Sequence, residues 1–195
     1  MEGIEKLVER ALEMRKQGLT EKEIENELHL SQDTVQWLLS ERVHSEKPPA
    51  DVYIGWRSIG SRAARIYMLS EIFADIIEEE KDKWEFEFDA IMGLAMTGIP
   101  LAQATAAIMD KDFIVYTVAD DCQGGKISSN FAGLEGKNVV IIDDVISSGK
   151  TMRAAIESLK KSGSNPVLAM VLVNKTKQDE INGMPIRALI RTIVV

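Results

Sequence analysis

Two adjacent carboxylates, Asp143 and Asp144, follow the strongly apolar segment 139–142. The β-branched residues of this segment predict a buried strand that carries both acids at its carboxyl end. In open α/β sheets, ligands bind at the carboxyl ends of the strands. Two carboxylates there can accept hydrogen bonds from sugar hydroxyls, or hold a Mg²⁺ ion that arrives with a phosphorylated ligand. A solvated strand end that binds nothing is the alternative interpretation.

The residues after the two acids have the composition of an anion-binding loop. Backbone N–H groups at a helix start, together with small hydroxyl side chains, bind phosphate. Lys150 is interpreted either as a further phosphate contact or as a solvated lysine of the first helical turn. The residues predicted to surround a phosphate are Ser147, Ser148, Gly149, Lys150 and Thr151.

Two other nucleotide-binding motifs are excluded by spacing. Gly149-Lys150-Thr151 has the residues that end a P-loop, but that loop requires a glycine where Asp144 stands. No G-x-G-x-x-G follows a predicted strand, which excludes a dinucleotide fingerprint.

The elements that must position the loop alternate between strand and helix patterns. Helices are predicted over 61–80, after Thr97-Gly98-Ile99-Pro100 and up to Met109, and over about 150–161; the predicted strands are 88–94, 113–118, 139–142, 167–173 and 186–195. This order predicts an α/β fold, with a parallel sheet of about five strands flanked by helices. A polar stretch, 120–133, is long enough to form a lid over the ligand, with Lys126 in it.

Residues 1–47 predict three short helices, the second and third of which resemble a helix-turn-helix. Thr20 and Glu23 form a capping box, and Ser31 can cap the third helix. If the third helix contacts DNA, the side chains that reach the bases are Gln32, Gln36, Trp37 and Ser40. The alternative is a dimerisation or docking unit with Trp37 in the interface, because this region has seven basic and eleven acidic residues.

A connector, 48–60, separates this predicted domain from a second one over 61–195, since Pro48-Pro49 breaks any helix. The densest group of basic residues lies at its end: Arg57, Arg62 and Arg65. These arginines are interpreted as contacts to a DNA backbone, as partners of the acids near Glu78, or as contacts to a second copy of the chain.

The segment Val139–Thr151 resembles the phosphoribosyl-pyrophosphate (PRPP) motif of type I phosphoribosyltransferases. The resemblance implies that Asp143 and Asp144 hold the ribose hydroxyls and that Ser147 to Thr151 bind the 5′-phosphate. Residues 93–100 resemble the pyrophosphate loop of the family's orotate branch, which implies a pyrophosphate contact by Met96, Thr97 and Gly98. Mg²⁺ is implied as the companion of PRPP.

A narrower resemblance covers nearly the whole chain. The helix-turn-helix pattern, the connector 51–60 and the segment 125–132 are similar to archaeal orotate-phosphoribosyltransferase-like regulators of the GfcR type. This resemblance implies a homodimeric transcriptional regulator with DNA and a phosphorylated small molecule as partners. The alternatives are an active phosphoribosyltransferase that joins PRPP to orotate or a purine, and an adaptor that does not bind DNA.

The chain departs from an orotate enzyme in the stretch Thr117–Lys126. The enzymes have a basic catalytic loop there, whereas this chain has Asp120 and Asp121, with Lys126 as the only basic residue. Loss of cations that meet the departing pyrophosphate costs roughly 10² to 10³ in rate for each contact. The sequence therefore predicts that the site binds PRPP as a sensor, and catalysis is not expected.

Composition limits the remaining function classes. The 195 residues carry a net charge of −8, which excludes unspecific binding of polyanions. The single cysteine, Cys122, cannot form an internal disulfide and is interpreted as incidental. The absence of a secretory signal pattern and of apolar runs of membrane-spanning length predicts a cytoplasmic protein that does not enter a membrane.

Overall fold

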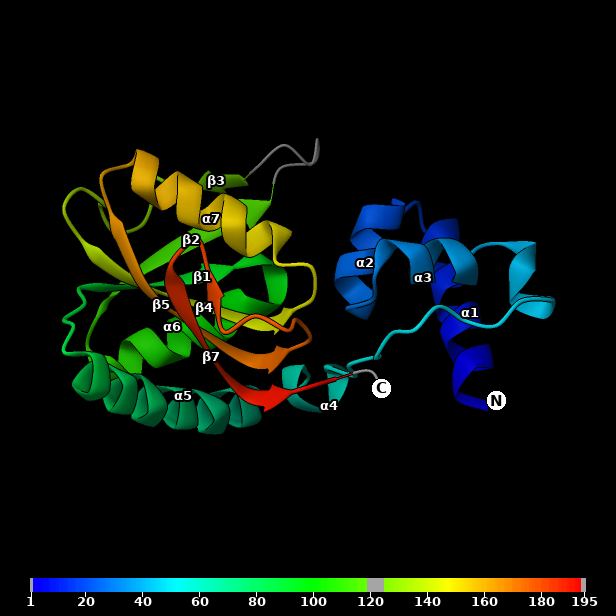
Figure 1. Ribbon diagram of the computed structural model, residues 1–195, viewed down its shortest axis with the longest axis horizontal. Coiled ribbons are helices and arrows are strands. Elements are labelled where there is room, and N and C mark those ends of the chain that lie inside the picture. Colours follow the sequence, from blue (N-terminus) through cyan, green and yellow to red (C-terminus); the bar gives the residue numbers. More distant parts are fainter. Residues whose placement is uncertain (1, 119–124, 194–195) are drawn as a thin grey trace. The chain divides into compact units, whose positions relative to one another are not determined.

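A computed structural model describes residues 2–118 and 125–193 (Figure 1). These residues form two compact units, one that ends at Gly55 and includes Thr192 and Ile193, and one that comprises Trp56–Arg191. The division falls inside the connector predicted over 48–60. Within the described ranges, none of the helices combines the length and the apolar composition that a bilayer span requires.

The larger unit contains a seven-stranded sheet in the order β3-β2-β1-β4-β5-β7-β6. The five central strands are parallel, as predicted: β1 (Ala90–Leu94), β2 (Asp112–Val118), β4 (Asn138–Ile146), β5 (Asn165–Asn174) and β7 (Met184–Arg191). The two edge strands, which the sequence did not predict, are antiparallel to their neighbours: β3 (Gly125–Ile127) and β6 (Glu180–Ile181). Both are too short to show an alternating pattern.

Helices cover both faces of the sheet (Figure 1). On one face lie α5 (Ala63–Trp84) and α6 (Ala95–Met109), and on the other lies α7 (Lys150–Lys161). The short α4 (Arg57–Gly60) precedes α5. The prediction that α6 follows Pro100 is wrong, because residues 95–100 already form its first turns and Pro100 lies inside the helix.

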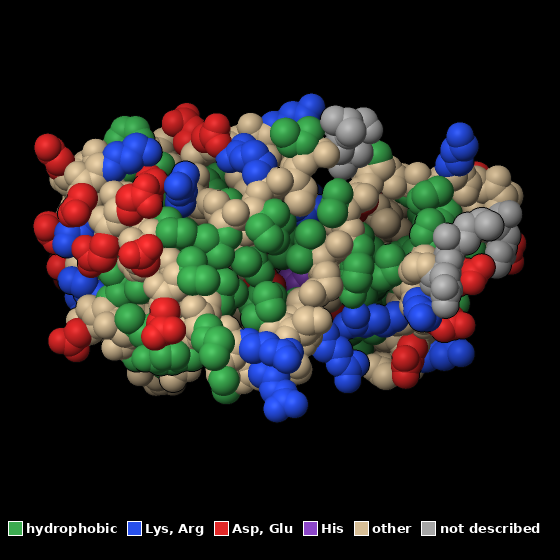
Figure 2. All heavy atoms as spheres, turned by 90° about the horizontal axis from the view of Figure 1, so that it is seen from below, with side chains coloured by type: hydrophobic (Ala, Val, Ile, Leu, Met, Phe, Trp, Pro, Cys, Tyr) green, Lys and Arg blue, Asp and Glu red, His purple; other side chains and the backbone are tan. Residues whose placement is uncertain are grey.

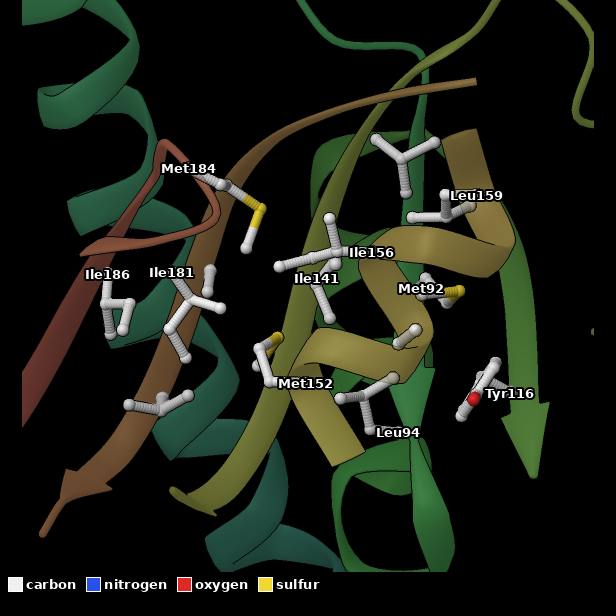
Figure 3. Packing of buried hydrophobic residues seen from close by; sticks show 14 of the residues in the cluster. Met92, Leu94, Tyr116, Ile141, Met152, Ile156, Leu159, Ile181, Met184 and Ile186 are labelled. Atoms are coloured by element: carbon white, nitrogen blue, oxygen red, sulfur yellow. The ribbon is translucent and has the colours of Figure 1, made fainter. Parts of the chain in front are cut away.

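One apolar layer of this unit lies between α7 and the sheet, and buried side chains of α5 and α6 pack on the other face. The buried side chains of α7 recur at helical spacing, so they form one stripe: Met152, Ala155, Ile156 and Leu159. Figure 3 shows this stripe against side chains of the central strands, among them Met92, Leu94 and Ile141. Because this layer is tightly packed, it fixes the position of β4 relative to the start of α7. Both ends of the loop between them are therefore held in place.

The N-terminal unit consists of α1 (Glu2–Lys16), α2 (Glu21–Leu28), α3 (Gln32–Leu38) and a 3₁₀ helix, η1 (Glu41–His44). The capping box is present: Glu23 N–H donates to Thr20 Oγ1 at 3.2 Å, and Thr20 N–H donates to Glu23 Oε2 at 2.7 Å. Ser31 caps α3 by accepting from Thr34 N–H. The carboxylate of Asp51 in turn accepts from Ser31 N–H at 2.7 Å, which ties the connector to the start of α3.

We expect Ile156→Ala to lower the free energy of unfolding by about 2–5 kcal/mol, because it leaves a cavity in the filled layer under α7. Chemical denaturation of the full chain measures this change. Glu157→Ala, on the exposed side of the same helix, is the matched control and should change stability by less than about 0.5 kcal/mol. Equal effects of the two substitutions would contradict the assigned packing.

Candidate functional site

Asp143 and Asp144 lie inside β4, which continues to Ile146, so the prediction that the strand ends at Ile142 is wrong. Both side chains are buried, with 8% and 2% of their surface exposed. Asp143 Oδ1 accepts a hydrogen bond from Asp144 N–H at 2.9 Å, and Asp144 Oδ1 accepts one from Val145 N–H at 2.8 Å. These local bonds fix the orientation of both carboxylates.

The environment of Asp143 opposes its ionisation. Burial raises the pKa of Asp143 well above its usual value, and the adjacent charge of Asp144 raises the pKa further. The hydrogen bond from Asp144 N–H lowers the pKa but does not outweigh burial. A cation or a set of hydroxyl donors at this position would favour the ionised form, so the pair is suited to a ligand that supplies either.

The first turn of α6 approaches the two acids closely. A Cβ atom at Gly98 would lie 2.9 Å from the Ile142 carbonyl oxygen and 3.0 Å from Asp143 Oδ1. Only glycine fits this approach, so the structure brings the predicted pyrophosphate segment and the acidic pair together. Within that segment Thr97 is half-buried, whereas Met96 is largely exposed.

The turn between β1 and α6 also adopts an unusual backbone conformation. Ala95 has a φ angle of +52°, the left-handed region. This conformation costs a residue with a Cβ atom about 1 kcal/mol or more. Such strain is concentrated at functional sites in many proteins, which agrees with the position of Ala95 beside the segment 96–98.

The predicted phosphate loop is a three-residue bend between β4 and α7. Gly149 has a φ angle of +72° and precedes the first residue of α7. Ser148 Oγ accepts from Lys150 N–H at 3.4 Å, which orients the hydroxyl towards the helix start. Thr151 is half-buried, and Lys150 is exposed. Because the first N–H groups of a helix lack helical acceptors, this end of α7 can bind an anion.

Arg153 also contacts this loop, although the sequence pattern does not indicate it. Its Nη2 donates to the Ser148 carbonyl oxygen and lies 3.3 Å from the position of a Cβ atom on Gly149. Arg153 therefore stabilises the loop and adds positive charge beside it. Its spacing of one helical turn from Gly149 is the signal that could have found it.

The predicted lid is only partly a loop. Its second half contains β3, in which Lys126 pairs with Thr117 of β2 and keeps an exposed side chain. Beyond β3, Ala132 N–H donates to the Phe113 carbonyl oxygen, and Phe131 packs edge-on against the Phe113 ring. The prediction of one continuous polar loop over 120–133 is therefore wrong for its second half. Residues 120–124, with Cys122 and the two acids of the expected catalytic stretch, lie outside the described residues.

In the N-terminal unit, two of the four predicted DNA contacts lie on the exposed face of α3. Gln32 and Gln36 are exposed. The prediction for Trp37 is wrong: its side chain is 4% exposed and belongs to the core between the three helices. Ser40 lies beyond the end of α3 and donates to the Trp37 carbonyl oxygen. A seven-residue helix packed against both α1 and α2 buries a wide face, which includes Trp37.

A carboxylate occupies the exposed surface next to Gln36. Gln36 Nε2 donates to Glu21 Oε2 at 3.3 Å, and Arg15 Nη1 lies 3.3 Å from Glu21 Oε1. Glu21 thus pairs with Arg15 and accepts a hydrogen bond from the Gln36 amide, which the sequence predicts to contact DNA. Neither Glu21 nor Arg15 is indicated by the sequence pattern. Both line a surface pocket of about 370 Å³, together with Leu12, Gln36, Leu39, Ser40 and Arg42.

Comparison with known proteins agrees with this geometry. The family model of the phosphoribosyl transferase domain matches residues 56–186. Adenine phosphoribosyltransferase from Thermoanaerobacter pseudethanolicus superimposes with a TM-score of 0.60 at 19% identity, over 89% of this chain and all of its own. UMP synthase from Leishmania donovani has a TM-score of 0.57 at 26% identity, over 75% of this chain and 31% of its own.

Two curated relatives extend the similarity over the full length. "Transcriptional regulator GfcR" from Thermoplasma acidophilum is 49% identical over 195 residues, which cover all of this chain and 98% of the relative. The protein of the same name from Picrophilus torridus is 48% identical, with complete coverage of both chains. The chain therefore belongs to the phosphoribosyl transferase domain family and, within it, to the archaeal GfcR group.

Proposed function

We propose that this protein is a DNA-binding transcriptional regulator whose phosphoribosyltransferase-like domain binds PRPP or a related phosphorylated sugar or nucleotide as its effector. The observation that carries the proposal is the convergence at Asp143: the Gly98 turn of α6 approaches the acidic pair, from which β4 leads into the phosphate loop. Similarity over the whole chain to proteins named transcriptional regulators supports the regulatory role.

Each part of the site has a chemical role in binding such a ligand. Asp143 and Asp144 accept hydrogen bonds from the ribose hydroxyls. The start of α7, with Ser147, Ser148 and Thr151, binds the 5′-phosphate, and the turn 96–98 faces the pyrophosphate. Mg²⁺ would bind with the ligand, because carboxylate and phosphate oxygens are the ligands that this ion prefers.

In this proposal the N-terminal unit contacts DNA through Gln32 and Gln36 of α3 and through Ser40, which lies just beyond the helix. Two copies of the chain would place two such units on one two-fold operator. Pairing of weak contacts also offsets the acidic charge of each unit, since two linked sites bind far more tightly than one. We place this dimeric regulator in the cytoplasm.

Recovery of genomic fragments bound by the full-length protein tests the regulatory role. A common two-fold motif is the expected result, and addition of Mg²⁺ with PRPP should change the yield of bound fragments.

A second candidate, an active phosphoribosyltransferase, is favoured by the intact acidic pair and loop. Pyrophosphate release at ordinary enzyme rates with orotate or a purine would establish the enzyme and remove the sensor.

We expect Asp143→Asn to weaken PRPP binding at least tenfold, as measured by calorimetry, and at the same time to stabilise the fold at neutral pH. The raised pKa means that the folded state binds more protons than the unfolded state above about pH 4, so wild-type stability falls as pH rises through the folded pKa. The side-chain amide of the Asp143→Asn variant does not ionise, so the variant does not lose stability in this way. The difference in the free energy of unfolding between the variant and the wild type should therefore widen from about pH 4 upwards, and its pH-dependent part should vanish below about pH 4.

The exposed Asp82→Asn is the matched control for this pair of measurements. It should change neither PRPP affinity nor the pH dependence of unfolding. Unchanged PRPP affinity in a folded Asp143→Asn protein would show that the acidic pair does not bind the ligand.

We expect Glu21→Gln to tighten DNA binding about two- to fivefold, because the substitution removes a negative charge beside Gln36 and releases Arg15 for a phosphate. Titration of the selected fragment at several salt concentrations measures the effect, which should shrink as salt rises. Glu5→Gln, an exposed acid of α1 that does not line the pocket, is the control. Weaker binding by Glu21→Gln would assign the carboxylate itself to base contact.

A further inference from the structure

Helix α5 exposes an apolar stripe on the side that faces away from the sheet. Tyr67, Met68 and Ile72 are exposed by 50%, 62% and 49%, whereas Phe73 and Ile77 of the same helix are fully buried. Figure 2 looks onto the side of the molecule where α5 lies in Figure 1 and shows hydrophobic side chains gathered there. A contiguous group of exposed apolar side chains is a candidate interaction surface.

The two ends of this stripe carry opposite charges. Arg62 and Arg65 stand at its amino-terminal end, and Asp75 and Glu79 follow it on the carboxyl side. Positions 65, 68, 72, 75 and 79 are three or four residues apart, so they share one face of the helix. The face therefore runs from basic to acidic, with an apolar middle that the exposed Glu71 borders on one side.

Two acidic residues near the end of α5, Glu78 and Glu80, pair with basic residues other than Arg62 and Arg65. Lys81 Nζ lies 3.0 Å from Glu78 Oε2, and Arg187 Nε lies 3.3 Å from Glu80 Oε1. Within residues 2–118 and 125–193, no salt bridge engages Arg62, Arg65, Asp75 or Glu79. The guanidinium of Arg65 donates one hydrogen bond, from Nη1 to the Ser58 carbonyl oxygen, and its other N–H groups can meet a partner. The interpretation that the arginines pair with acids of their own chain thus has no support from the described contacts.

We propose that a second copy of this chain docks on this face, with the two α5 helices antiparallel about a two-fold axis near position 70. In this arrangement Met68 packs against the partner's Ile72, and Arg65 pairs with the partner's Asp75. Arg62 then meets the acidic segment that begins at the partner's Glu78. A parallel arrangement would instead place like charges together, so the charge order specifies the antiparallel one.

A helix face with this order complements itself under a two-fold rotation, which is the symmetry of most homodimers. The inference rests on the dimer in the proposed function and names its surface. The same axis would relate two N-terminal units, as a two-fold operator requires.

Sedimentation velocity of the full-length protein over a range of concentrations tests the interface. The wild type should dimerise, and Arg65→Glu or Asp75→Arg alone should weaken the dimer at least tenfold, because each places like charges opposite one another. The double substitution Arg65→Glu with Asp75→Arg restores the pairing with reversed sign and should recover most of the dimer. Lys161→Glu, an exposed site on α7, is the charge-matched control and should remain dimeric.

Met68→Glu provides a second probe, which should disrupt the dimer while the circular dichroism spectrum stays unchanged. A wild type that remains monomeric at all concentrations would overturn both the dimer and its surface. A wild-type dimer that persists in Arg65→Glu, Asp75→Arg and Met68→Glu would overturn the surface alone. DNA selection with the same variants measures the regulatory role separately, so its failure cannot be mistaken for failure of the interface.

Discussion

The burial of two like-charged carboxylates at one point of β4 is the constraint on which the rest of the site depends. A buried carboxylate loses its hydration, and a second one beside it adds repulsion, so this arrangement lowers stability unless a ligand compensates for it. The surroundings are built to hold the pair in place: local N–H donors fix both side chains, and the filled layer under α7 fixes the strand. In the proposed function, the bound ligand compensates for this cost.

The same constraint explains which parts of the site could be predicted from the sequence. The apolar strand, the acidic pair and the loop that follows are contiguous, so their spacing alone indicates them. The approach of Gly98 to Asp143 joins segments more than 40 residues apart, and only the family resemblance pointed to it. Arg153 was missed because its role depends on the direction of its side chain towards Ser148, which helical spacing permits but does not dictate.

The errors in the fold have similar causes. Gly98 and Pro100 are helix breakers by local propensity, but the packing of α6 on β1 and β4 overrides that preference. The sequence pattern assigns Val35, Leu38 and Leu39 to one apolar face of α3 and predicts Trp37 on the opposite, exposed face. In a helix that packs on two neighbours the buried face is wider, and it includes the tryptophan. The edge strands β3 and β6 have three and two residues, and they are defined by their pairing with β2 and β7, which a local sequence pattern does not reveal.

The proposed PRPP site lacks a basic catalytic loop in its sequence, which is the pattern expected of a sensor. Catalysis requires interactions that are stronger in the transition state than with the bound ligand, and cations near the departing pyrophosphate supply them. Binding requires only the contacts that hold the ligand, which in the proposed function are the acidic pair, the helix start and the turn at Gly98. A binding event becomes regulation if the ligand favours one of two arrangements of the protein, and its differential affinity for the two arrangements sets the limit of the effect. The acidic pair suits that purpose, because ionisation of Asp143 is opposed in the empty site and favoured by a cation or hydroxyl donors, so a bound ligand gains a difference in free energy to exert on the protein around it.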